Sequence, residues 1–118
     1  PRGGDKLIEL SRESLRESLQ RAAILCNEKF RGVRLNLSEG LLRIQSNNPE
    51  QEEAEIELEI DYHGGPLEIG FNVGYLLDVL NTVKAELVKL TFADANSSLL
   101  MEEVGGSKAL YVVMPMRL

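Results

Sequence analysis

A chain of 118 residues is long enough to bury the core of one domain and too short for two. No apolar run approaches the roughly 18 residues that are needed to cross a bilayer. The net charge of −6 argues against a domain that binds nucleic acid tightly through its phosphates, because such domains are usually basic.

The chain begins with a predicted strand and helix. Residues 6–11 (KLIELS) alternate like a short strand, and Ser11 or Ser14 can cap a helix that runs to about Cys26. Apolar residues on that helix recur at i, i+4, i+7 and i+11. We expect these residues to form one buried stripe: Leu15, Leu19, Ala22 and Cys26.

Three strands are predicted to follow the helix. Residues 32–38 (GVRLNLS) and 41–46 (LLRIQS) read as a hairpin with a tight turn at Gly40. Residues 53–62 then alternate isoleucine and leucine with glutamate, as expected for a strand with one buried face.

The same order of elements begins again after a loop at residues 63–66. Asn72 is placed to cap a second helix, and the predicted elements are a strand at 67–71, a helix from 73 to about 84, and strands at 87–92, 98–104 and 109–116. The chain therefore predicts an α+β fold of two βαβββ half-repeats, with two helices packed on one side of antiparallel sheets. The halves share negligible sequence identity, so an irregular α+β sandwich without symmetry is the alternative.

The ends and the single cysteine suggest a cytoplasmic fragment. Residues 1–5 open with Pro-Arg-Gly-Gly, which is typical of a linker, so we expect the folded domain at residues 6–118 of a piece cut from a longer protein. Cys26 is the only cysteine and cannot form an internal disulfide, which suits a reducing cytoplasm.

Catalytic and metal-binding groups are scarce. His63 lies in a Gly/Pro loop, where a solvated side chain is favoured over a general base, and a packed thiol at Cys26 is favoured over a nucleophile. One cysteine and one histidine cannot make a zinc site, and no phosphate-binding glycine motif is present. The acidic run at residues 50–55 lacks the spaced ligands of a calcium loop and indicates a solvated or partner-facing edge. We therefore expect no enzyme, no cofactor and no metal.

Two apolar features lie outside the predicted core. Ile24 is nearly opposite the buried stripe of its helix and Leu25 is about a quarter-turn from it, which indicates an association site unless a loop or second sheet covers them. The C-terminal residues 112–118 are also strongly apolar. A core strand with a frayed end explains the first of them well, but accounts poorly for Met114-Pro115-Met116.

Five segments carry a resemblance to a known family: 21–25 (RAAIL), 27–34 (NEKFRGVR), 47–55 (NNPEQEEAE), 68–73 (EIGFNV) and 111–118 (YVVMPMRL). These segments resemble the third, C-terminal domain of the DNA polymerase III beta subunit, the bacterial DNA sliding clamp. The resemblance is in register and extends over essentially the whole chain from about Lys6.

The resemblance implies a processivity factor that catalyses nothing. In this family three similar domains form a protomer, and two protomers close into a homodimeric ring around duplex DNA without sequence specificity. A clamp loader opens the ring. The polymerase III alpha subunit, other polymerases and repair proteins then bind through short linear peptides in a groove between the second and third domains. The location implied is the cytoplasm, at the nucleoid during replication, and no membrane is involved.

The resemblance also assigns residues to three surfaces. This chain's wall of the peptide groove would comprise Asn72, Tyr75, Asn96, Ser98, Val112, Val113, Met114, Pro115, Met116, Arg117 and Leu118. Asn96 departs from the family pattern, in which this position is often apolar. The joint with the second protomer would use Ile24, Leu25, Glu50, Glu52 and Glu53. From helix placement alone, we expect Arg16, Arg21 and Lys84 to line the DNA channel.

Two rival interpretations differ in class. An unrelated protein-binding adaptor of similar α+β fold would use the acidic edge or the tail for another partner. A hydrolase would require an exposed Cys26 of low pKa beside His63.

Overall fold

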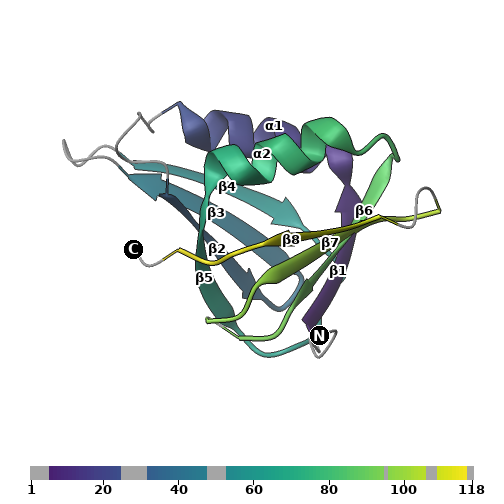
Figure 1. Ribbon diagram of the computed structural model, residues 1–118. Coiled ribbons are helices and arrows are strands. Elements are labelled where there is room, and N and C mark those ends of the chain that lie inside the picture. The colour runs from purple at the N-terminus through teal and green to yellow at the C-terminus, as the bar shows by residue number, and fades with distance from the viewer. Residues whose placement is uncertain (1–5, 25–31, 48–52, 95, 106–108, 117–118) are drawn as a thin grey trace.

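The computed structural model describes residues 6–24, 32–47, 53–94, 96–105 and 109–116 of the chain. It has two helices and two four-stranded antiparallel sheets, which confirms the predicted fold class (Figure 1). The elements in chain order are β1 (Lys6–Ser11), α1 (Arg12–Ala23), β2 (Gly32–Ser38), β3 (Leu41–Asn47), β4 (Glu53–Glu59), β5 (Leu67–Asn72), α2 (Val73–Thr82), β6 (Leu87–Phe92), β7 (Leu99–Glu103) and β8 (Leu110–Val113).

The order strand, helix and three strands thus occurs twice, as predicted. The sheets, however, do not follow the two halves. One sheet has the order β1-β6-β7-β8 and the other has the order β4-β3-β2-β5. The first strand of each half therefore pairs within the sheet of the other half, so neither half can form its sheet alone.

Both helices begin where a polar side chain accepts hydrogen bonds from the first turn. The Ser11 hydroxyl accepts from the main-chain N–H of Ser14, and Asn72 Oδ1 accepts from those of Gly74 and Tyr75. These interactions satisfy N–H groups that have no partner inside the helix. Of the two serines considered from sequence, Ser11 is the cap.

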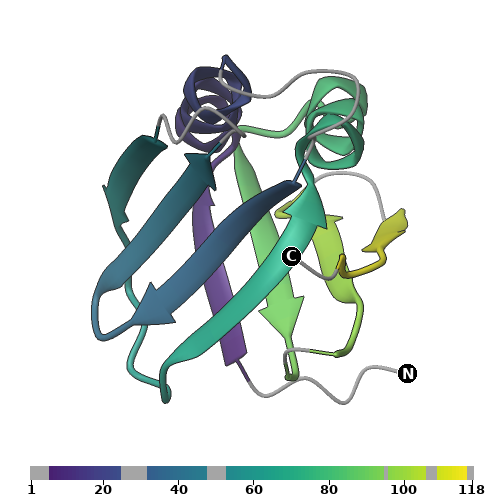
Figure 2. The ribbon, with the colours of Figure 1, turned by 90° about the vertical axis from the view of Figure 1, so that its left-hand side faces the viewer.

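The helices lie side by side across the ends of the strands, where β1 leads into α1 and β5 leads into α2 (Figure 2). The predicted stripe of α1 is buried at Leu15, Leu19 and Ala22, while Cys26 lies outside the described residues. From α2, Leu76 and Leu80 enter the same apolar core. Within the described part of the chain, neither helix is long and apolar enough to span a membrane.

Several element boundaries differ from the sequence prediction. Helix α1 ends at Ala23 with Ile24 as its C-cap, and α2 ends at Thr82 because Val83 adopts an extended conformation with ψ of 152°. Strand β4 ends at Glu59 instead of Tyr62, and the last strand ends at Val113 instead of Met116. Pro115 explains this last end in part, since it has no N–H to donate to a ladder.

The loop that joins the halves is anchored to the β2–β3 turn. Gly40 has a positive φ of 68°, its N–H donates to Tyr62 O, and its carbonyl accepts from the Ile60 N–H. The buried Tyr62 hydroxyl donates in turn to the carbonyl of Gly65 at 2.5 Å. The turn therefore holds the loop in place through main-chain and side-chain hydrogen bonds.

Candidate functional site

The C-terminal tail leaves its own sheet and reaches the other one. Val113 is buried opposite Leu99 at the end of β8, and the main-chain N–H of Met116 then donates to Gly70 O on β5 at 2.8 Å. Gly70 and Met116 form an isolated antiparallel bridge. The tail thus closes the gap between the edge strands of the two sheets.

This crossing leaves large apolar side chains exposed. Val112 is 56% exposed, Met114 is 68% exposed and Met116 is 37% exposed. Residues 114 and 115 belong to no strand. The interpretation of the tail as a core strand therefore holds only for residues 110–113. The remainder forms an apolar surface.

Two polar residues of the predicted groove lie around this surface. Asn72 is two residues beyond the bridged Gly70, and its carbonyl oxygen is occupied by the cap of α2. Ser98 lies just before β7, and its hydroxyl donates to the Met114 sulfur at 3.1 Å. Both are therefore held in position by local hydrogen bonds.

Tyr75, in the first turn of α2, is 60% exposed. Its aromatic ring can therefore take part in contacts at the corner where Asn72 caps the helix. Arg117 and Leu118, predicted for the same groove, lie outside the described residues.

Asn96 occupies a turn that Asp94 organises. The Asp94 carboxylate accepts hydrogen bonds from the Asn96 main-chain N–H at 2.8 Å and from the Ser97 hydroxyl at 2.9 Å, and these hydrogen bonds lower the pKa of Asp94. The Asn96 side chain is exposed. The turn thus presents an amide where the family pattern favours an apolar group.

The end of α1 presents an apolar residue beside an acidic strand edge. Ile24 is 79% exposed. Within the described part of the chain, this supports an uncovered association site over a residue that a loop or second sheet covers. The Ser46 hydroxyl on β3 donates to Ala22 O near the end of the helix, and Ser46 is paired with Ala54 on β4. This brings Ile24 and Glu53 to one corner. Leu25, Glu50 and Glu52 lie outside the described residues.

The outer face of β4 is acidic along its whole length. Exposed glutamates alternate along the strand at 53, 55, 57 and 59. Arg43 on β3 pairs with Glu57 at 3.1 Å and with Glu55 at 3.6 Å, while within the described residues Glu53 and Glu59 make no ion pair. Since β4 pairs only with β3, its second main-chain edge is open within the described residues.

The basic residues predicted for a DNA-facing surface differ in their environments. Arg16 is half-buried and pairs with Glu13 at 2.5 Å, whereas Arg21 and Lys84 are exposed. Arg12, which sequence reasoning missed, donates from Nη1 to Leu80 O at 2.9 Å and links the start of α1 to α2. The sequence around Arg12 does not indicate this hydrogen bond, because the carbonyl that Arg12 binds lies 68 residues away along the chain.

His63 is 74% exposed, in agreement with a solvated side chain. Its Nδ1 contacts the Glu39 carboxylate on the β2–β3 turn, and its Nε2 lies 2.9 Å from Asp61 Oδ1. The hydrogen bond to Glu39, followed by the charge of the same group, raises the pKa of His63 above 6.5. Within the described ranges there is no cluster of three or more residues able to hold a metal ion.

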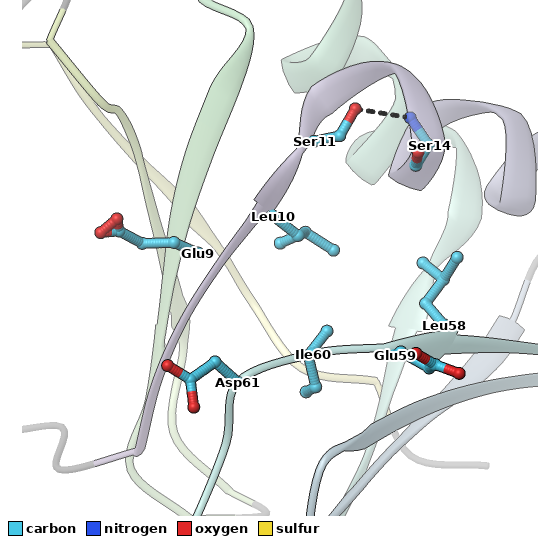
Figure 3. Close-up of a pocket in the computed structure, with 8 residues that line it drawn as sticks. All are labelled: Glu9, Leu10, Ser11, Ser14, Leu58, Glu59, Ile60 and Asp61. Carbon is cyan, nitrogen blue, oxygen red and sulfur yellow. Dashed lines mark hydrogen bonds between the residues drawn. The ribbon is translucent and has the colours of Figure 1, made fainter.

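A further cavity, which sequence reasoning missed, lies between β1 and β4 (Figure 3). It has a volume of about 540 Å³ and is lined by Glu9, Leu10, Ser11, Ser14, Leu58, Glu59, Ile60 and Asp61. The side chains of Leu10, Leu58 and Ile60 turn toward the space between the strands, while the carboxylate of Glu9 turns away from it. The cavity therefore has an apolar floor and an acidic rim.

Comparison with known families gives one match over almost the whole chain. Residues 1–117 match the family described as DNA polymerase III beta subunit, C-terminal domain.

Similar proteins are longer than this chain. The beta sliding clamp of Pseudomonas aeruginosa is 60% identical over all 118 residues, and that of Escherichia coli K12 is 53% identical. In both cases the chain spans only 32% of the relative's length.

Solved structures share the fold at high and low identity. The crystal structure of the Pseudomonas aeruginosa DNA polymerase sliding clamp with ligand has a TM-score of 0.95 at 60% identity, covering 100% of this chain and 32% of that one. The DNA polymerase III beta subunit of Thermotoga maritima has a TM-score of 0.93 at 31% identity, with the same coverage of both chains.

Proposed function

Because the chain belongs to the family formed by the C-terminal domains of DNA polymerase III beta subunits, we propose that it is the third domain of a DNA sliding clamp. In the full-length protein two protomers form a ring around duplex DNA. The ring catalyses no reaction; it keeps polymerases and repair proteins on DNA in the cytoplasm. A clamp loader opens it.

The observation that carries the proposal is the crossing of the tail onto β5. It places exposed Met114 and Met116 beside the Asn72 cap, which gives an apolar strip bordered by polar groups. Such a combination suits a short peptide with apolar anchor residues, because the apolar contacts supply affinity and a few polar groups fix the register.

This strip is one wall of a groove, and the neighbouring domain supplies the other. An isolated chain therefore binds such peptides weakly, because anchor residues contribute most of their energy when they are fully enclosed. We assign Arg117, Leu118 and Asn96 to the same wall from the family resemblance alone.

A peptide-binding assay on the full-length protein tests the groove. We expect a fluorescent short clamp-binding peptide to lose at least tenfold in affinity, about 1.4 kcal/mol, when residues 114–118 are deleted. A matched variant, Glu17→Gln on the exposed side of α1, should bind like the parent. Undiminished binding by the deletion variant would exclude the groove.

The joint between protomers is proposed at the corner of Ile24 and Glu53, continued by Leu25, Glu50 and Glu52. The supporting observations are the exposure of Ile24 and the position of Glu53, which makes no ion pair within the described residues although Glu55 and Glu57 of the same strand pair with Arg43. Basic residues across the joint would steer and register association more than they add affinity. The double substitution Ile24→Ala and Leu25→Ala should make the full-length protein sediment as a folded monomer; a persistent dimer would place the joint elsewhere.

The negative charge of the chain fits a ring that holds DNA topologically. Such a ring needs only a mildly basic lining, since many phosphate contacts would prevent sliding. Exposed Arg21 and Lys84 can supply this lining, while Arg16 is already paired with Glu13.

A further inference from the structure

The two halves of the fold create two equivalent seams between the sheets. One seam lies between edge strands β5 and β8, and the other lies between edge strands β1 and β4. Strands β1 and β5 each have six residues, share nearly the same alternation of burial, and end at the helix caps Ser11 and Asn72. Aligning the two caps makes Glu9 the counterpart of Gly70.

The β5/β8 seam is occupied by the chain's own tail. There the Met116 N–H donates to Gly70 O, and the tail adds a short antiparallel segment to β5. In the β1/β4 seam, within the described residues, no main-chain hydrogen bond joins the two strands. The cavity of about 540 Å³ lies at this place.

The main chain of β1 is oriented to pair with such a segment. In an antiparallel ladder, residues alternate between those that hydrogen-bond to the neighbouring strand and those that face away from it. The Arg12 N–H donates to Glu86 O, and the register with β6 continues from Ser11↔Leu87 to Glu9↔Lys89. The N–H and C=O of Glu9 therefore face away from β6 and into the seam, as the carbonyl of Gly70 does on β5.

The side chains around the seam indicate the chemistry of the occupant. Buried Leu10 and partly buried Leu58 and Ile60 form an apolar floor, which suits one apolar side chain of a segment that pairs with β1. Glu9 and Glu59 on the rim make no ion pair within the described residues. A positively charged residue is the natural complement of this rim.

We propose that the β1/β4 seam binds an extended segment of a partner protein. The segment pairs with the main chain of Glu9, places one apolar side chain against Leu10, Leu58 and Ile60, and sets a lysine or arginine beside the Glu9 carboxylate. The site lies at the opposite end of β4 from Glu53, so it is separate from the proposed joint, and it does not rest on the proposed peptide groove.

A peptide with the sequence of residues 111–118 (YVVMPMRL) is a suitable probe, because Met116 of this sequence bridges to Gly70 in the equivalent seam and the sequence supplies an arginine. Added to the ¹⁵N-labelled chain, it should shift the amide signals of Leu7, Glu9 and Ser11 in a saturable manner. A peptide of the same composition in scrambled order should leave these signals unchanged.

Two variants at Glu9 test the main-chain and charge contributions separately. Glu9→Pro removes the N–H that faces the seam, and proline is tolerated on an edge strand whose N–H is not used in the ladder. It should abolish binding. Glu9→Lys should weaken binding about fivefold, and substituting Arg117→Glu in the peptide should restore it. Glu17→Lys on α1, an exposed acidic residue away from the cavity, is the matched control.

Unchanged binding by Glu9→Pro, or peptide-induced shifts confined to residues outside the seam, would overturn the proposal. So would a concentration-dependent shift of the same amides without peptide, because a second copy of the chain would then be the occupant. Because Glu9→Lys and the charge-reversed peptide form a cycle, a folding defect of Glu9→Pro would leave the charge contribution measurable.

Discussion

Asn72 has two roles that substitution can separate. Its Oδ1 accepts hydrogen bonds from the main-chain N–H groups of Gly74 at 2.8 Å and Tyr75 at 3.3 Å, so it caps α2. Within the described residues its Nδ2 donates no hydrogen bond, and this group remains for a peptide. The acceptor thus serves the fold, and the donor serves the proposed groove.

Asn72→Ala should lower both stability and peptide affinity. Loss of an N-cap costs about 1 kcal/mol, which for a domain of this size lowers the melting temperature by about 4 °C. Asn72→Asp keeps the acceptor and adds a charge that the helix N-terminus favours, so its stability should stay within about 0.5 kcal/mol of the parent. It lacks the donor, and peptide affinity should fall about fivefold, as expected for one lost hydrogen bond.

Thermal unfolding followed by circular dichroism measures the stability of each variant, and peptide anisotropy on the full-length protein measures affinity. Ser11→Ala removes the equivalent cap of α1, which makes a single hydrogen bond of 3.2 Å. It should cost about 0.5 kcal/mol and leave peptide affinity unchanged. Equal destabilisation by Asn72→Asp and Asn72→Ala would refute the capping role, and unchanged affinity in both would remove Asn72 from the groove.

Two further predictions concern the loop between the halves. A Cβ at Gly64 would lie 2.6 Å from the buried Tyr62 hydroxyl, whereas a Cβ at Gly65 would meet nothing within 4 Å. In urea unfolding, Gly64→Ala should therefore lower the free energy of unfolding by about 1–2 kcal/mol, and Gly65→Ala should change it little. Similar values for both variants would contradict the packing argument. Because the folded-state pKa of His63 is raised above 6.5, its stabilising contribution is complete below about pH 6.5 and is lost as pH rises through the folded-state value. Glu39→Gln should lower the pKa of His63 in an NMR titration, and an unchanged pKa would show that Glu39 is not its cause.

Local patterns in the sequence predicted the elements well. The alternation of β2 and the periodicity of α1 follow directly from which side chains face the core. The bounds of β2 were predicted as observed, whereas α1 ends about three residues before its predicted end. The capping role of Asn72 also follows from residue type and position. Each of these features depends only on neighbours within a few residues.

Features that depend on distant pairing could not be predicted in the same way. The exchange of β1 and β5 between the sheets brings together residues from opposite halves, such as Ser11 with Leu87 and Val33 with Phe71. The cavity between β1 and β4 exists only because of this exchange. Its lining residues alternate like those of any half-buried strand, so no local signal distinguishes them.

In the candidate site, too, local features could be predicted from the sequence and distant contacts could not. The apolar tail and exposed Ile24 could be recognised because they departed from the expected pattern. The crossing of the tail to Gly70 could not, since a single bridge between chain segments 46 residues apart leaves no mark in either segment. The family resemblance assigned residues to the peptide groove and the protomer joint, whereas the structure shows the hydrogen bonds that those residues make within the chain.

The central claim is that this chain is part of a ring that holds DNA topologically. In the most direct measurement, a clamp loader places the full-length protein on a nicked circular plasmid. The salt concentration is then raised to suppress phosphate contacts. Gel filtration measures the bound protein before and after the plasmid is cut once. The account predicts retention on the circle and release from the linear DNA. Equal retention on both forms, or salt-induced release from the circle, would contradict it.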